Sequence, residues 1–343
     1  MTNNYGIGFY AGLPLSDPDA LQQVSLPTPT PGLQDLIVEV HAVSVNPIDT
    51  KLRPTVSESD TPTIQGYDAT GVVTAVGGQV TNFQPGDRVL YAGTTTRPGA
   101  NQHLQAVDSR IVAPAPAGPT DAELAALPLV GLTAWELLFE RMGFTPAAGA
   151  NAGQTLLIIN GAGGVGSIMS QLAHWSGLTV IATASPSHFE WLAQHHVDVP
   201  IDYHDNLIAS VQQAGYSQVN GVAILHQTEP YIVAASKLVA PLGHVGALVT
   251  PTAPLDVTLL KPKAASLDFE YMFTKTDHQV ALTTQGAILS RLVALLAAGN
   301  ITSDVALSLS PITVDNLRQA TAAVETGHMA GKAVVSGGFP PEN

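Results

Sequence analysis

Short alternating runs of apolar and polar residues fill the first 130 positions of the chain. Leu36–Val45 alternates well enough to predict a strand with one covered face. Gly71–Gly77 and Phe83–Leu90 repeat the pattern, and a Pro-Gly pair inside the second run predicts a turn. Helical periodicity is poor throughout. Because repeated short strands must hide their edges, this region is predicted to form a compact, barrel-like β domain.

From Thr155 onward, short apolar runs alternate with helical patterns, notably at Val165–Ser176 and Pro230–Leu238. Six strands are expected in this region, at residues 156–160, 180–184, 199–202, 219–225, 244–249 and 267–273. Such alternation is typical of a parallel sheet with helices on both faces. The predicted fold class is therefore α/β, with a β-barrel domain followed by a doubly wound, six-stranded parallel sheet.

The remaining elements are too few for a third domain. Helices are expected at Thr283–Ala298 and Val314–Thr326, and strands at Val305–Leu309 and Lys332–Ser336. We expect this segment to return to the first domain. The predicted division is residues 1–130, residues 131–276, and the returning segment 277–343.

Composition narrows the functional classes. With 343 residues, 45% of them hydrophobic, two globular domains are expected. A formal charge of −14, with no Lys or Arg between Arg141 and Lys237, argues against a nucleic-acid partner. The absence of cysteine excludes disulfides, thiolate metal sites and thiol nucleophiles. Met1–Tyr5 lacks the basic start of a leader and no apolar run approaches a membrane span, so a cytoplasmic protein without a membrane partner is expected.

A glycine-rich loop carries the clearest chemistry. The expected strand ending at Asn160 runs into a G-x-G-x-x-G sequence and then into a helix. Glycines at this spacing permit a tight turn and close approach of a pyrophosphate, whose charge the helix N-terminus favours. A dinucleotide site is therefore predicted, formed by Gly161, Gly163, Gly164, Val165 and Gly166.

The choice of dinucleotide depends on the next expected strand. NAD-selective sites place an Asp or Glu at its end to bind the ribose hydroxyls. Here Ser185, Ser187 and His188 follow the strand, and the first carboxylate is Glu190. The missing acid favours NADPH, with these three side chains as donors to its 2′-phosphate, although no Arg or Lys is nearby. The alternative is that they only cap the following helix.

Several stretches together resemble the medium-chain dehydrogenase/reductase superfamily, and within it the zinc-free quinone oxidoreductase branch, whose members are often labelled zinc-type alcohol dehydrogenase-like. The resemblance is carried in order along nearly the whole chain by residues 43–51, 66–73, 85–89, 128–135, 161–166 and 331–335. It implies a GroES-like first domain, a Rossmann second domain, a cleft between them, a small-molecule substrate and a homodimer.

The resemblance also bears on metal binding. Zinc-dependent members carry a Cys at the position of Asn46 and Gly-His-Glu where this chain has Gly-Tyr67-Asp68, and residues 127–133 contain no Cys, His, Asp or Glu. A catalytic zinc needs three protein ligands, and only Asp49 and Asp68 remain as ligand types at these motifs. We expect no zinc.

A metal-free site needs another donor for the oxygen of the substrate. By resemblance, Tyr67 and Asn46 line the site, Tyr67 as a hydroxyl proton donor and Asn46 as an amide that orients a carbonyl. Each has an alternative: Tyr67 packs beneath the cofactor, and Asn46 forms a turn before Pro47. Asp49 is expected to have a structural role.

Further cofactor contacts follow from the resemblance and from the strand ends. Tyr203 matches a tyrosine that touches the 2′-phosphate in related NADPH-dependent reductases, or else is a solvated rim residue. His226 and Thr250 end two parallel strands on the side where cofactors bind. Phe273 and Thr274 end the last strand, near where the family holds the carboxamide.

The favoured function is NADPH-dependent reduction of a quinone or an α,β-unsaturated carbonyl. An alcohol or aldehyde dehydrogenase is the first alternative, weaker because an unactivated alcohol gains most from a metal Lewis acid. A cofactor-binding protein with little turnover is the second.

Overall fold

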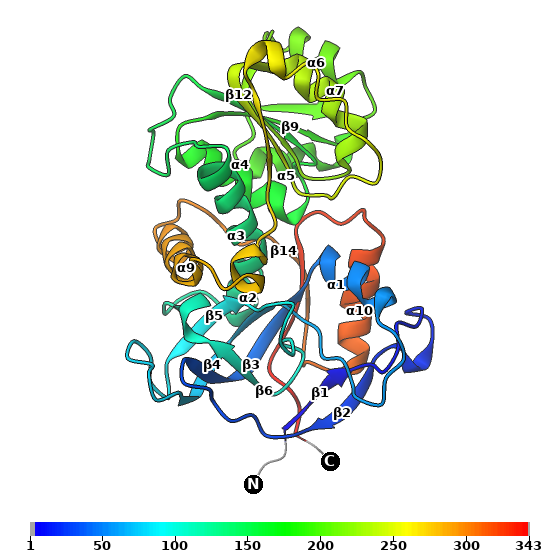
Figure 1. Cartoon of the computed structure of the whole chain (residues 1–343), viewed down its shortest axis with the longest axis vertical. Helices are drawn as coiled ribbons and strands as arrows, with labels where there is room; N and C mark the ends of the chain where they lie inside the picture. The colour runs from blue at the N-terminus through cyan, green and yellow to red at the C-terminus, as the bar shows by residue number, and fades with distance from the viewer. Residues whose placement is uncertain (1–3, 342–343) are drawn as a thin grey trace. The chain divides into compact units, whose positions relative to one another are not determined.

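The computed structural model describes residues 4–341 and divides into two compact units (Figure 1). The first unit comprises residues 1–129, 273–299 and 303–343, and the second comprises residues 130–272 and 300–302. Residues 1–3, which belong to the stretch where a leader would begin, lie outside the described residues.

A seven-stranded sheet forms the centre of the first unit. Its order is β14-β15-β3-β4-β5-β7, and β6 also pairs with β3. The strands are β3 (Asp35–Val45), β4 (Asp68–Val76), β5 (Arg88–Ala92), β6 (Leu104–Asp108), β7 (Val112–Pro114), β14 (Val305–Leu309) and β15 (Lys332–Ser336). A separate two-stranded sheet holds β1 (Asn4–Gly8) and β2 (Gln22–Leu26). The repeated short strands expected from the alternating pattern are therefore present.

Strand β3 is central to this sheet because three other strands pair with it, and its apolar residues are almost fully buried. It pairs antiparallel with β4, β6 and β15, and Val45 lies opposite Ala333. The unit also contains the helices α1 (Pro47–Leu52), α2 (Asp121–Ala125), α8 (Thr274–Asp277), α9 (Leu282–Ala297) and α10 (Val314–Glu325).

Helix α1 differs from the turn that Asn46 and Pro47 favoured. Pro47 occupies the first helical turn, where its missing N–H costs nothing. Asn46 is the N-cap, and its backbone N–H donates to Oδ2 of Asp49 at 2.8 Å. The same Asn-Pro pair therefore starts a helix, because a carboxylate three residues later satisfies the N-cap amide.

The second unit contains a six-stranded parallel sheet of order β10-β9-β8-β11-β12-β13. Its strands are β8 (Thr155–Ile159), β9 (Thr179–Ala184), β10 (Val199–Asp202), β11 (Val219–Ile224), β12 (Val239–Ala247) and β13 (Ser266–Phe269). This is the doubly wound dinucleotide-binding order, with its switch point between β8 and β11. The predicted α/β fold class, GroES-like barrel-type domain plus Rossmann sheet, is confirmed.

Helices pack on this sheet as the alternating pattern predicted. α4 (Gly164–Trp175) contacts β8 and β9, α5 (Phe189–Gln194) contacts β9 and β10, and α7 (Thr228–Leu238) contacts β11 and β12. The remaining helices are α6 (Leu207–Gln213) and α3 (Pro128–Trp135), which a π-helical turn at 136–141 extends. Across residues 4–341, we find no helix with both the length and the hydropathy that a membrane crossing requires.

Candidate functional site

The loop that joins β8 to α4 is held tightly against the neighbouring strand. Gly161 N donates to the carbonyl of Thr183 at 2.8 Å, and Asn160 N donates to its Oγ1 at 3.0 Å. A Cβ at Gly161 would lie 2.6 Å from Cβ of Ala182, and one at Gly166 would lie 2.4 Å from the Asn160 carbonyl oxygen. Glycine is therefore required at both positions, for helix-on-strand packing and for the tight turn.

Helix α4 begins at this loop with no side chain capping its first amides. Gly163 is the N-cap, in an extended conformation. The first backbone N–H groups of a helix have no intrahelical acceptor, so those of Gly164, Val165 and Gly166 are available, at the positive end of the helix dipole. These residues fit the pyrophosphate of a dinucleotide.

The side chains expected at the 2′-phosphate lie together beyond the end of β9. Ser185 Oγ is 2.9 Å from Ser187 Oγ and 3.2 Å from Nδ1 of His188. The backbone N–H of Tyr203, which follows β10, donates to the carbonyl of Ala184 at 3.3 Å. The structure thus brings Tyr203 beside this serine cluster, with its side chain 47% exposed.

Of the four other residues expected at strand ends, two follow strands of the parallel sheet and two do not. His226 and Thr250, both exposed, follow β11 and β12 at the same carboxyl edge of the parallel sheet as the glycine loop. Phe273 and Thr274 do not end the last strand, because β13 stops at Phe269. Phe273 instead precedes α8 in the first unit, where its ring is buried, so the expected strand through residue 273 is wrong.

Tyr67 immediately precedes β4 in the first unit, and its side chain is 6% exposed. Its ring centroid is 4.7 Å from that of Phe273, at a tilted angle of 53°. Its carbonyl accepts a hydrogen bond from Gly93 N at 2.8 Å. These contacts fix the position of the ring, as either proton donation or packing would require.

Beside Tyr67, the Asp68 carboxylate is the centre of a buried polar cluster. Its Oδ2 accepts hydrogen bonds from Asn46 Nδ2 at 2.8 Å, Lys332 Nζ at 3.0 Å and Ser44 Oγ at 3.1 Å. Its Oδ1 accepts one from Leu129 N at 2.6 Å. Both oxygens of this carboxylate are thus hydrogen-bonded and its charge is paired, which is the condition for keeping a charge buried.

The side-chain amide of Asn46 forms all its hydrogen bonds within this cluster. Its Nδ2 donates to Asp68 and, at 3.4 Å, to the carbonyl of Ser44, while its Oδ1 accepts from Lys332 Nζ. The side chain is 0% exposed. An amide whose two hydrogens are already bonded does not support the expected contact with a substrate carbonyl, so the structure places Asn46 as part of the scaffold.

Asp49 is a second buried carboxylate, on α1. Its Oδ2 accepts from the Asn46 backbone N–H, the Gly66 backbone also interacts with the carboxylate, and the side chain lines a cavity of about 20 Å³. Burial, reinforced by the nearby charge of Asp68, raises the pKa of Asp49 to about 7, although the Asn46 hydrogen bond and the Lys332 ammonium oppose the shift.

The donor set at these positions does not fit a catalytic zinc. Zinc prefers thiolate, imidazole and free carboxylate ligands. Here the matching positions hold an amide, a phenol and a carboxylate that already binds the Lys332 ammonium. Within residues 4–341 no three His, Asp or Glu side chains are grouped as metal ligands.

Sequence reasoning missed Lys332 and the central role of Asp68. Lys332 opens a strand whose next three residues are apolar and buried, and it is itself 3% exposed. A lone cation at the start of a buried strand is a signal for a buried partner. The partner is not identifiable from sequence, because it lies 264 residues earlier.

Comparison with known proteins agrees with this architecture. A model of the alcohol dehydrogenase GroES-like domain matches residues 32–118, and a zinc-binding dehydrogenase model matches residues 195–335. A zinc-type alcohol dehydrogenase-like protein of Staphylococcus epidermidis is 33% identical, covering 96% of this chain and 98% of that protein. The NADPH-dependent alkenal/one oxidoreductase of Arabidopsis thaliana is 28% identical, covering 88% of this chain and 71% of that protein.

Solved structures extend the similarity to three dimensions. A crystal structure described as a zinc-dependent alcohol dehydrogenase protein from Rhizobium etli has 39% identity and a TM-score of 0.91, covering 99% of this chain and 100% of that one. The quinone oxidoreductase of Coxiella burnetii has 25% identity and a TM-score of 0.80, covering 98% and 99%. The chain therefore belongs to the medium-chain dehydrogenase/reductase superfamily and is an oxidoreductase of that family.

Proposed function

We propose that the protein uses NADPH to reduce a quinone or an α,β-unsaturated carbonyl, without zinc. The observation that carries this proposal is the cluster of Lys332, Asp68 and Asn46, in which a buried ammonium binds the carboxylate at the family's metal-ligand positions. An alcohol gains most from a metal Lewis acid, whereas a quinone or enone is already activated towards reduction. The names of the Arabidopsis and Coxiella relatives, an alkenal/one oxidoreductase and a quinone oxidoreductase, support these acceptor classes.

The cofactor assignment rests on the second unit. The amides of Gly164, Val165 and Gly166 would hold the pyrophosphate, and Ser185 and His188 would hold the 2′-phosphate. No carboxylate stands at the end of β9 to repel that phosphate. When bound, NADPH supplies the hydride for the reduction.

In the first unit, Tyr67 is our candidate for the proton donor. Reduction of an enone or quinone builds negative charge on its oxygen, and a donor aimed at that oxygen stabilises the charge. The Tyr67 hydroxyl can both donate this hydrogen bond and transfer its proton, since phenol is acidic enough to do so near neutral pH when solvent restores the proton. The contacts of the ring with Phe273 hold it in place for this role.

An acceptor screen tests the proposal. Purified protein is mixed with NADPH or NADH and a panel of quinones, enones and aldehydes, and separately with NADP+ or NAD+ and a panel of alcohols, and the absorbance of the reduced cofactor is followed. We expect NADPH consumption with quinones and enones and little with the others. Turnover of primary alcohols would instead favour the alcohol dehydrogenase activity that the names of the staphylococcal relatives carry. Tight NADPH binding without turnover on any acceptor would favour a cofactor-binding protein.

A further inference from the structure

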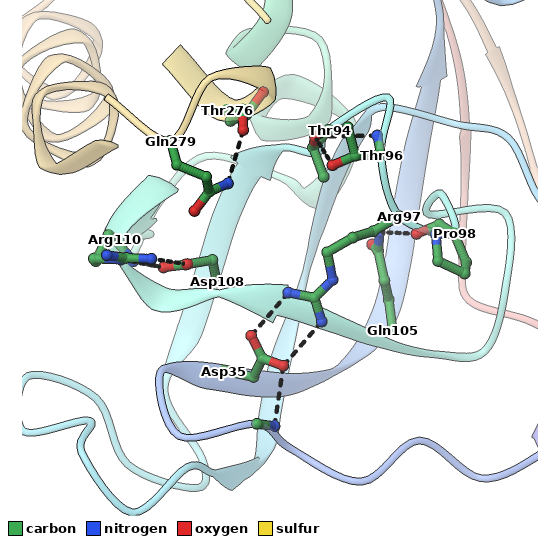
Figure 2. Close-up of polar contacts among 11 residues, drawn as sticks. Asp35, Thr94, Thr96, Arg97, Pro98, Gln105, Asp108, Arg110, Thr276 and Gln279 are labelled. Carbon is green, nitrogen blue, oxygen red and sulfur yellow. Dashed lines mark hydrogen bonds and ion pairs between the residues drawn. The ribbon is translucent and has the colours of Figure 1, made fainter. Parts of the chain in front are cut away.

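A pocket of about 190 Å³ lies in the first unit beside Gly93, at the end of β5. Arg97, Thr94 and Gln279 supply its polar wall, and Val107, Ile111 and Leu282 supply an apolar one. Figure 2 shows Thr94 and Arg97 on the loop after β5 and Gln279 on the segment after α8. At roughly 30 Å³ for each water, this volume equals about six waters, which suits a small ring with a substituent. We call it the Arg97 pocket.

Two residues of the Arg97 pocket are hydrogen-bonded to the backbone of Tyr67 and Phe273. Gly93, which lines it, donates its backbone N–H to the carbonyl of Tyr67 at 2.8 Å. Thr276, which also lines it, donates its hydroxyl to the carbonyl of Phe273 at 3.0 Å. Since the rings of Tyr67 and Phe273 pack together, two walls of the pocket are each one hydrogen bond away from this aromatic pair.

The polar wall retains hydrogen-bonding capacity that the protein itself does not use. Arg97 gives two of its five N–H donors to the two oxygens of Asp35, at 2.8 and 2.9 Å. Gln279 commits Nε2 to the carbonyl of Thr276, which leaves its Oε1 as an acceptor. The Thr94 hydroxyl accepts a hydrogen bond from the backbone N–H of Thr96 and also contacts the Thr96 hydroxyl. Only one of these two hydroxyl groups donates in that contact, so the proton of the other remains available.

The charges around the pocket cancel. Arg97 is paired with Asp35, and Arg110 is paired with Asp108 at 2.6 Å (Figure 2). A bound carboxylate or phosphate would be repelled by the carboxylates of Asp35 and Asp108, which already neutralise the two guanidinium groups. A neutral ligand whose oxygen accepts from Arg97 or Thr94, or whose hydroxyl donates to Gln279, meets no such competition.

Gln279 has an uncommon backbone conformation, which six other non-glycine residues among residues 4–341 share, Ala281 among them. Its φ is +54°, in the left-handed region that non-glycine residues seldom adopt. Gln279 follows the end of α8, and its side chain turns back to donate to the carbonyl of Thr276. Residues held in such conformations cluster at ligand sites, where a fixed orientation is useful.

From these observations we infer that the Arg97 pocket holds a neutral, oxygen-bearing substituent of the acceptor, and so selects hydroxylated or methoxylated quinones and enones over their alkyl counterparts. The inference rests on the proposed function, which supplies the acceptor classes. The apolar residues Val107, Ile111 and Leu282 would cover the hydrocarbon part of the substituent.

The test compares two acceptors of equal size, 2-hydroxymethyl-1,4-benzoquinone and 2-ethyl-1,4-benzoquinone. The wild type should reduce the hydroxymethyl compound with a kcat/KM about two- to tenfold higher, the factor that one or two net hydrogen bonds provide. Thr94→Val and Gln279→Leu should each lower kcat/KM for the hydroxymethyl compound more than for the ethyl compound, which brings the preference towards unity. Gln212→Leu, at an exposed position on α6 in the other unit, is the matched control.

A second readout needs no turnover. Benzyl alcohol, a ring of similar size that cannot be oxidised when no NADP+ or NAD+ is present, is titrated without cofactor in a ligand-observed NMR experiment against the wild type and the two variants. Weaker binding to the variants than to the wild type and to Gln212→Leu supports the pocket. If quinones are reduced but neither the preference nor benzyl alcohol binding responds to the variants, the pocket assignment is overturned and the proposed function stands. If no acceptor is reduced but benzyl alcohol binding still depends on Thr94 and Gln279, the proposed function fails and the binding site remains.

Discussion

The ammonium of Lys332 lies 3.0 Å from Oδ2 of Asp68, and the two side chains are 3% and 0% exposed. This ion pair joins the first residue of β15 to the first residue of β4. Both strands flank β3, so the pair links its two neighbours at one end of the sheet.

Removing the cation should therefore destabilise the first unit selectively. Lys332→Met leaves the Asp68 carboxylate buried and without its counter-charge, which typically costs about 3–5 kcal/mol. Hydrogen exchange measured by mass spectrometry should show earlier opening of the first unit, while the parallel sheet of the second unit keeps its protection. Lys51→Met, at an exposed position, serves as the control. Equal protection in Lys332→Met and wild type would show that the pair contributes little.

The raised pKa of Asp49 implies that the stability of the folded chain depends on pH. The pKa of Asp49 in the folded chain is about 7, whereas that of an unfolded Asp is about 3.9. Between these values the folded chain binds the proton that the unfolded chain has lost, so stability falls as pH rises from about 4 to 7. Asp49→Asn, which is neutral throughout, should flatten this part of the curve of Tm against pH. The exposed substitution Asp60→Asn should leave it unchanged. Parallel curves for wild type and Asp49→Asn would contradict the shift.

Tyr67→Phe tests the proton donor. Loss of one oxyanion donor typically costs about a hundred- to thousand-fold in kcat. We expect a smaller loss here because water can substitute, and a larger loss with enones than with quinones because quinones form stabilised anions. NADPH affinity should remain almost intact. Steady-state kinetics on both acceptor classes gives the answer, with Tyr10→Phe as a control at a more exposed tyrosine. Weaker NADPH binding with unchanged turnover would mark Tyr67 as a packing residue.

Cofactor preference should respond to a single carboxylate at the end of β9. The wild type is expected to bind NADPH more tightly than NADH by a modest factor. Ser185→Asp should reverse this, because the new carboxylate repels a 2′-phosphate and can accept from ribose hydroxyls. Fluorescence titration with both cofactors measures the effect, and Ser217→Asp, on an exposed loop of the same unit, controls for added charge. Equal wild-type affinities that Ser185→Asp leaves unaltered would place the adenosine end elsewhere.

Metal analysis addresses the zinc-independent mechanism directly. Elemental analysis of untagged protein should find no stoichiometric zinc, and a chelator should leave the rate of NADPH consumption unchanged. The physical ground is that the carboxylate of Asp68 is already neutralised by Lys332. One tightly bound zinc per chain, whose removal abolishes activity, would restore the alcohol dehydrogenase alternative.

The features that the sequence predicts well are those decided within a few residues. The glycine loop needs only β8, a turn and the start of α4, and the steric reason for Gly166 is local, whereas that for Gly161 is the approach of Ala182 on β9. The order of strands and helices in the second unit likewise follows from short-range periodicity. The fold class is accordingly predictable from the amino-acid sequence alone.

What could not be predicted depends on distant partners. Asn46 favours a turn by itself, yet it caps a helix and gives its amide to Asp68, because Asp49 and Lys332 satisfy its other groups. The strand expected through residue 273 ends at Phe269, since Phe273 is buried against Tyr67 instead. The Arg97 pocket combines the loop after β5 with the end of α8, which no local pattern connects.

The strand pairing of the first unit also determines when its sheet can be completed during translation. Every strand of the parallel sheet comes from one continuous stretch, residues 155–269, whereas β3 finds its neighbour β15 only at residues 332–336. Lys332 emerges 264 residues after Asp68, a delay of roughly 13–50 s at ordinary rates of translation. During that interval the middle of the nascent chain can fold completely, while one edge of β3 and the carboxylate of Asp68 await their partners. The first unit, with which translation begins, is thus the unit whose sheet can be completed last.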